Sequence, residues 1–196
     1  MARDVEGREL TFTERARRTQ LIDVTVQTLA ERGYPGTSLS AIAERAGITK
    51  AAVLYHFPSK AALIRAAYQH VLGALVKHVG AAVEEAGPAR GPEAYIREMI
   101  GHLRRHPSHT RMIIEAITHE DEQPDQDPAV RWQALAGVLA EAREANGLPP
   151  TDQRTAALVI GGAIDALVAE HLRDPSFETA AAAEELIELV GSAWRG

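Results

Sequence analysis

Residues 37–60 read TSLSAIAERAGITKAAVLYHFPSK, and this stretch predicts two short helices joined by a tight turn. Thr37 and Ser38 precede the first helix, over residues 39–46, as an N-cap pair. Gly47 ends that helix, Thr49 caps the next one, and Phe57-Pro58 breaks it. Two short capped helices around a glycine turn have the spacing of a helix-turn-helix.

The side chains of this stretch divide into an apolar set and an outer set. The apolar set allows two short helices to pack at a steep angle: Ile42, Ala43, Ala46, Ile48, Val53 and Phe57. The outer set is mostly small or polar: Ser38, Ser40, Arg45, Thr49, Lys50, Ala51, Ala52, Tyr55 and His56. A helix with small and polar groups at its N-terminal end suits insertion into the major groove of DNA.

The remainder of the chain predicts further helices and no strand, so the expected fold class is all-α. A first helix is expected over residues 13–32, with Thr13 as N-cap and Gly33 as its stop. Later helices are expected over residues 59–86, from 92 to the break at Pro107, and over 108–119, 128–146, 151–173 and 178–194. Residues 120–128 hold five acids and two prolines, which predicts a solvated connector.

Composition limits the classes of function. The 196 residues are 45% hydrophobic, contain no cysteine and carry a formal net charge of -6. Between residues 13 and 60, however, seven basic residues stand against four acidic ones, a local excess of three positive charges that suits a phosphate-binding face. The absence of cysteine, of a signal-like N-terminus and of a run near 20 apolar residues predicts a cytoplasmic protein without a membrane anchor.

The stretch from Arg18 to Leu63 resembles the DNA-binding domain of the TetR family of repressors. The matching motifs are residues 30–34 (AERGY), Thr37-Ser38, Ile42-Ala43, Ala46-Gly47 and residues 56–60 (HFPSK). The family often has two aromatic residues before the histidine, and here the first of these positions holds Leu54. The resemblance implies an all-α chain of about nine helices, with a helix-turn-helix domain over residues 1–60 and a ligand-binding and dimerisation domain over residues 61–196.

The resemblance also implies a function: a homodimer that binds a palindromic operator in double-stranded DNA and releases it when a small molecule binds. It assigns phosphate contacts to Thr37, Ser38, Tyr55, His56 and Lys60. It assigns base-facing positions to Ser40, Thr49, Lys50, Ala51 and Ala52. The helix over residues 59–86 connects this surface with the presumed pocket and would act as the lever between them.

The last two long helices are implied to form a four-helix interface with a second copy. Small residues between large ones permit close helix approach in the interface set of Leu158, Ile160, Gly161, Gly162, Ile164, Leu167 and Val168. The alternative is that these residues fill a core within one chain. For the ligand, candidate wall residues are Tyr68, Leu72, Tyr95, Met99, Ile113, Ile117, Trp132 and Leu135, and their character favours an apolar or weakly polar effector. Each of these eight residues suits a plain core equally well.

Three other functions were weighed against this one. His102 and His106 have the spacing that places two imidazoles on one helix face, with His109 just beyond, but two ligands bind a metal weakly and a solvated helix end explains them as well. An enzyme lacks support, since no nucleophile elbow or phosphate-binding glycine loop is present. An architectural DNA-bending protein would leave two thirds of the chain without a task. We therefore expect no catalytic residue, no cofactor and no metal.

Overall fold

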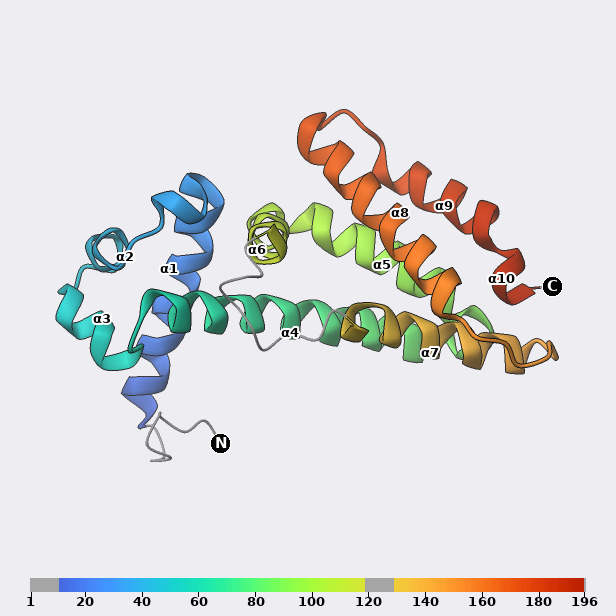
Figure 1. Ribbon diagram of the computed structural model, residues 1–196, viewed down its shortest axis with the longest axis horizontal. Coiled ribbons are helices and arrows are strands. Elements are labelled where there is room, and N and C mark those ends of the chain that lie inside the picture. Colours follow the sequence, from blue (N-terminus) through green and yellow to red (C-terminus); the bar gives the residue numbers. More distant parts are fainter. Residues whose placement is uncertain (1–10, 119–128, 196) are drawn as a thin grey trace. The chain divides into compact units, whose positions relative to one another are not determined.

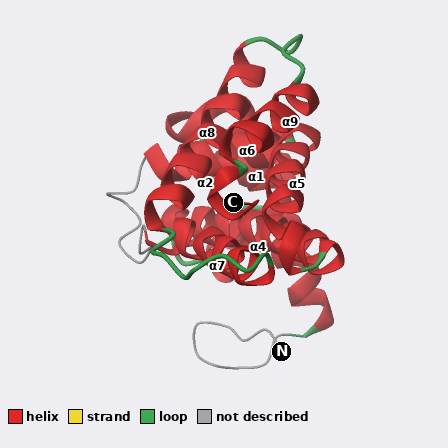
Figure 2. Cartoon of the chain, turned by 90° about the vertical axis from the view of Figure 1, so that its right-hand side faces the viewer, coloured by secondary structure: helices red, strands yellow, loops and turns green. Residues whose placement is uncertain are grey.

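The computed structural model describes residues 11–118 and 129–195, and every regular element in these residues is a helix (Figure 2). The expected all-α fold class is therefore confirmed. The described part of the chain has ten α-helices and one 3-10 helix, against the nine helices expected. The predicted connector at residues 120–128 lies outside the described residues.

The chain divides into two compact units, and the division differs from the expected boundary at residue 60. The described residues up to Leu72, together with α6 from Ser108, form the first unit; Gly73 to Pro107 and α7 to α10 form the second. The reason lies in an apolar cluster of the first unit. In this cluster Ile64, Ala67, Tyr68 and Val71 pack with Met112 against Val26 and Leu29. Residues 64–71 and Met112 are thereby packed against the first helix of the chain.

The described part of the first unit is built from five helices, four of which follow one another along the chain. Their bounds are α1 Phe12–Gly36, α2 Leu39–Ala46, α3 Lys50–His56, α4 Lys60–Ala86 and α6 Pro107–Thr118, with α4 continuing into the second unit. Figure 1 shows α1, α2 and α3 side by side, and α2 contacts both of the others.

The first helix starts two residues before the expected position. Thr11, not Thr13, is the N-cap, because its hydroxyl accepts from the Glu14 amide while the Glu14 carboxylate accepts from the Thr11 amide at 2.8 Å. Gly33 interrupts the helix as expected, with φ 68 and ψ 177. One further turn follows through Pro35, so the helix ends at Gly36.

The second unit also contains a short 3-10 helix, η1, and five α-helices. Their bounds are η1 Pro88–Arg90, α5 Gly91–Arg105, α7 Ala129–Ala145, α8 Arg154–Arg173, α9 Thr179–Val190 and α10 Ser192–Arg195. Helix α5 packs against α7, α8 and α9, and α8 and α9 lie side by side (Figure 1). The helix expected over residues 178–194 is two helices, since α10 turns at Gly191 and its carbonyls accept from Arg143 and Asn146.

Helix α8 has an unusual combination of composition and exposure. It is long and apolar enough to cross a membrane by length and composition, with a mean hydropathy of 1.5, which the sequence reading did not anticipate. Yet only 22% of that span is buried within the chain. One side, with Ile160, Ile164 and Val168, is buried in the unit, whereas Leu158 is 51% and Val159 is 59% exposed. The helix therefore has one packed apolar side and one uncovered apolar side.

Candidate DNA-binding site

Helices α2 and α3 are fixed at their ends by the caps that the sequence predicts. Ser38 Oγ accepts from the Ala41 amide and Thr49 Oγ1 accepts from the Ala52 amide, both at 3.1 Å. Gly47 adopts the left-handed conformation with φ 67, and the Ile48 amide then reaches the Ala43 carbonyl at 3.0 Å. The turn between the helices is thus closed by backbone hydrogen bonds, and the prediction of a helix-turn-helix is confirmed.

A buried cluster under the two helices holds α3 in place. Its members come from four helices and the segment between α3 and α4: Leu21, Ile42, Ala43, Ala46, Val53, Phe57 and Leu63. Val53 is the one fully buried residue of α3, and Phe57, directly after it, is 2% exposed. Because α3 is anchored through these two positions, the rest of its surface is left for a partner.

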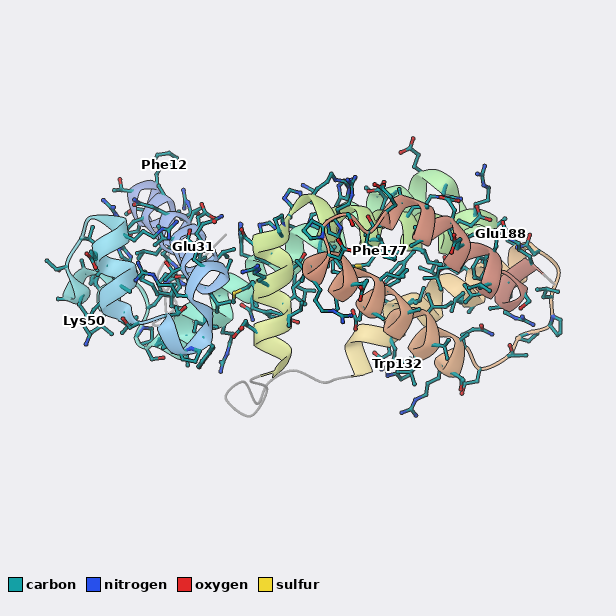
Figure 3. All side chains as sticks on the ribbon, turned by 90° about the horizontal axis from the view of Figure 1, so that it is seen from above. Phe12, Glu31, Lys50, Trp132, Phe177 and Glu188 are labelled. Atoms are coloured by element: carbon teal, nitrogen blue, oxygen red, sulfur yellow. The ribbon has the colours of Figure 1, made fainter. Side chains whose placement is uncertain are left out.

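Most of the predicted contact residues are exposed, either on α3 and its N-cap or at the start of α2. Exposed among them are Ser38, Ser40, Thr49, Lys50, Ala51 and Tyr55. Figure 3 shows Lys50 at the outer edge of its unit. Ala52, His56 and Lys60 are half-buried. The N-terminal end of α3 therefore offers small or flexible side chains with little bulk to obstruct approach to base edges.

Thr37 and Lys60 are held by contacts within the protein. Thr37 is fully buried, and its hydroxyl donates to the Gly33 carbonyl at 2.8 Å, so it supports the loop before α2 instead of reaching a phosphate. The Lys60 ammonium donates to the Tyr34 carbonyl at 2.9 Å and lies 4.0 Å from the centre of the Tyr34 ring. An ammonium has three donors, so Lys60 retains the capacity to bind a phosphate beside this contact.

Helix α1 also contributes to this surface, and the sequence analysis did not predict any contact residue from it. The Tyr55 hydroxyl donates to Glu14 Oε1 at 3.1 Å, and Arg18 donates to the His56 carbonyl. The Arg18 guanidinium also lies 4.0 Å from the centre of the Phe57 ring. Glu14 and Arg18 are four residues apart and so share one side of α1. This spacing was visible in the sequence, but nothing in it identified the far partner.

The candidate ligand residues fall into two groups. Tyr68 is buried in the apolar cluster that also holds Val71 and Met112, and Leu72 and Ile113 pack against that cluster. Tyr95, Met99, Trp132 and Leu135 belong to the second unit, where Leu135 is 2% exposed. The side chain of Ile117 lies outside the described residues. The apolar cluster of the first unit brings Tyr68, Leu72 and Ile113 together.

The interface and metal candidates are also changed by the structure. Ile160, Ile164 and Val168 are only 1%, 3% and 6% exposed within a single chain. These three residues therefore belong to a core within one chain, which was the alternative to the interface. Leu158, Gly161, Gly162 and Leu167 remain at least partly accessible. The rings of His102 and His106 are 4.4 Å apart, but no group of three or more metal-ligating side chains occurs among residues 11–118 and 129–195.

A capped helix-turn-helix with an exposed second helix defines a DNA-binding regulatory protein. Comparison with known proteins gives the family. Residues 21–67 match the family described as bacterial regulatory proteins, tetR family. The HTH-type transcriptional regulator RutR of Escherichia coli (strain K12) is 32% identical over 98 residues, which are 50% of this chain and 46% of RutR. The similarity to the TetR family therefore covers the N-terminal DNA-binding domain of the chain. The chain aligns with about half the length of this relative.

Solved structures share the fold over most of the chain. A putative transcriptional regulator from Pseudomonas aeruginosa PAO1 has a TM-score of 0.79 at 22% identity, covering 92% of this chain and 91% of that one. The transcriptional regulator FadR from Bacillus subtilis, solved in complex with stearoyl-CoA, has a TM-score of 0.70 at 20% identity, covering 89% of this chain and 98% of that one. At these identities the likeness establishes the arrangement of helices beyond the DNA-binding domain.

We predict that His56 makes the stability of the protein sensitive to acid. Burial lowers the pKa of His56, and the nearby charges of Arg18 and Arg17 lower it further, while Glu14 opposes them. Because the folded state binds this proton less readily than the unfolded chain, the stability due to neutral His56 is present above about pH 6.5 and is lost as the pH falls below it. In urea unfolding at pH 7.5 and 5.5, His56→Gln should therefore lose less stability on acidification than the unmodified protein.

The control for this measurement is His70→Gln, which removes an exposed histidine of the same unit. An equal loss of stability in His56→Gln and in the unmodified protein would contradict the prediction.

Proposed function

We propose that this protein is a ligand-responsive transcriptional repressor that binds a palindromic operator as a homodimer and releases it when a small molecule binds. The observation that carries the proposal is the capped α2-turn-α3 unit, with α3 anchored by Val53 and Phe57 and exposed at its N-terminal end. Such a protein works in the cytoplasm, where bacterial DNA is accessible. No catalytic function is proposed.

In the proposed complex, α3 lies in the major groove. Ser40, Thr49, Lys50, Ala51 and Ala52 face the bases, and Ser38, Tyr55, His56 and Lys60 face the backbone. Support comes from the difference in their chemistry. Thr49, Lys50, Ala51 and Ala52 lie at the N-terminal end of α3 and Ser40 lies in the first turn of α2, and apart from Lys50 these side chains are small and allow close approach. The second set carries hydroxyl, imidazole and ammonium donors, which bind phosphate oxygens.

The homodimer is proposed to form through the uncovered side of α8 together with α9. This side carries Leu158 and Gly162, and Leu189 of α9 is 80% exposed, whereas the predicted interface residue Leu167 is half-buried on another side of α8. An apolar helix face of this kind in a water-exposed chain favours burial against a second copy. Two glycines in succession, Gly161 and Gly162, have nothing within 4 Å of an added Cβ and leave space for close helix approach.

The effector is proposed to be apolar or weakly polar. Tyr68, Leu72 and Ile113 supply an apolar wall in the first unit, and Tyr95, Met99, Trp132 and Leu135 are the candidates in the second. Bacillus subtilis FadR, which shares the helix arrangement, was solved with stearoyl-CoA. Long-chain acyl-CoA is therefore the first probe to test on this chain. The proposed lever is α4, whose 27 residues begin at Lys60.

The proposed DNA function predicts a base-specific role for Lys50. In selection from a random duplex library, the protein should enrich a palindrome, and Lys50→Ala should change the preference at one position of each half-site. The loss at that position should be about 1 to 3 kcal/mol if Lys50 binds a guanine. Ser59→Ala, which removes a hydroxyl that accepts from the Ala62 amide, is the control and should keep the same consensus. Recovery of no consensus by the unmodified protein would contradict the proposed function.

The proposed dimer predicts that a charge on α8 separates the subunits. Leu158→Asp places a carboxylate in an apolar interface, where it has no partner, and this should raise the dimer dissociation constant at least about a hundredfold. Val76→Asp is the matched control, because Val76 is 61% exposed on α4 and lies outside the proposed interface. Sedimentation velocity measures both. The proposal would be contradicted if the unmodified protein were a monomer, or if Leu158→Asp left the dimer dissociation constant unchanged.

The proposed effector site predicts that enlarging its wall uncouples ligand from DNA. Leu72 is half-buried against the cluster that holds Tyr68. Leu72→Trp should abolish release of operator by stearoyl-CoA, and the accompanying rise in melting temperature, while leaving operator affinity within about twofold. Val76→Trp, at a 61% exposed position of α4 outside this cluster and outside the proposed DNA surface, is the bulky control for ligand response. Normal release by Leu72→Trp would place the ligand elsewhere.

A further inference from the structure

The first turns of α1 lie against the C-terminal end of α3. The Glu14 carboxylate accepts from the Tyr55 hydroxyl at 3.1 Å, and one turn later Arg18 donates to the His56 carbonyl and covers the Phe57 ring. Tyr55 is 70% exposed, so this contact is at the surface of the unit and not in its core. We propose that the C-terminal end of α3 faces the DNA backbone. The start of α1 contacts this end and so lies beside the same surface.

Arg17 lies on this same part of α1. It follows Glu14 by three residues and precedes the buried Leu21 by four, and residues at these spacings share a side of a helix. Its guanidinium donates to Gln20 Oε1 at 2.6 Å, and its side chain is half-buried. The positive charge of Arg17 also helps to lower the pKa of His56, which shows that the two side chains are electrostatic neighbours.

Arg15 provides a contrast within the same two turns. It lies on the opposite flank of Glu14, and its side chain is exposed, whereas that of Arg17 is half-buried. Arg15 and Arg17 are only two residues apart in α1, so replacing either one with alanine removes one positive charge from the same short segment. A general effect of net charge would therefore be the same at both positions, whereas a specific contact would not.

We infer that Arg17 is an additional DNA contact, which binds a backbone phosphate beside those bound through Tyr55 and His56. The start of α1 then extends the DNA-binding surface beyond the two helices of the helix-turn-helix. Arg17, Arg18 and His56 bring basic groups to this place against the single carboxylate of Glu14. A guanidinium is suited to the role because its planar fork matches two phosphate oxygens and keeps its charge at all relevant pH values.

The structure also explains how Arg17 would be placed for this contact. The bond from Arg17 to Gln20 is within one helix turn and restrains the long side chain before DNA arrives. The contacts of Glu14 and Arg18 with α3 fix the helix that carries it. A contact of this type adds affinity for any sequence and contributes no base preference.

The inference rests on the proposed DNA-binding function, and the test separates the two. Fluorescence anisotropy of the full chain is measured on a selected operator duplex and on a random duplex, from low to moderate salt. Arg17→Ala should weaken binding to both duplexes roughly five- to tenfold, with the slope of log affinity against log salt reduced by about 1. Arg15→Ala should change both affinities less than about twofold. Arg17→Lys, which keeps the charge, should restore most of the slope.

Two results would overturn the inference. Equal losses in Arg17→Ala and Arg15→Ala would show a general charge effect. A lower melting temperature for Arg17→Ala, with an unchanged salt slope, would show a packing role. Failure of the unmodified protein to prefer the selected duplex would instead reject the proposed function, because the phosphate contact is still measured on the random duplex.

Discussion

The position of α3 depends on one buried cluster, in which Val53 and Phe57 pack on Leu21, Ile42 and Leu63. A helix of seven residues is too short to be stable alone, so its direction is set by these contacts and by its caps. Everything proposed for the DNA surface follows from this constraint. Since α3 is attached along a single side, its N-terminal end and Tyr55 are available to a partner.

Polar contacts also hold the end of α3 and the loop that leads into α2. Toward α1, Glu14 and Arg18 hold the end of α3 at the surface. Toward α4, Lys60 holds the Tyr34 carbonyl, while Glu115 of α6 accepts from the Tyr34 amide at 3.0 Å. The peptide groups around the kink at Gly33 are thus bound from two helices. A shift of either helix would be felt in the loop that leads into α2.

Local features of the fold could be predicted from the sequence. Ser38, Gly47, Thr49 and the Phe57-Pro58 break were read correctly because caps and turns depend on residues a few positions apart. The start of α1 was misplaced because the cap was predicted at Thr13, although Thr11 and Glu14 have the Thr-x-x-Glu spacing of a capping box. The compact units divide the chain elsewhere than at residue 60, because α6 joins the first unit through contacts of Met112 with residues far away in the chain.

In the candidate site, too, the local features could be predicted from the sequence and the long-range contacts could not. Residue types identified the exposed end of α3, but the burial of Thr37 and the contact of Lys60 with Tyr34 depend on packing that has no sequence pattern. On α8 the pattern showed a nearly continuous apolar surface without showing which side the chain itself covers. The structure assigns Ile164 and Val168 to the covered side and leaves Leu158 on the other. That division leaves four of the seven residues first considered for the interface, Leu158, Gly161, Gly162 and Leu167, at least partly accessible.

The central claim is that two copies of α3 read one palindrome. Hydroxyl-radical footprinting of the unmodified protein on its selected duplex tests this most directly. Two protected regions related by the symmetry of the site, with centres one helical turn of about 34 Å or a multiple of it apart, are the predicted result. A single protected half-site, or weak protection spread evenly along the duplex, would contradict the account.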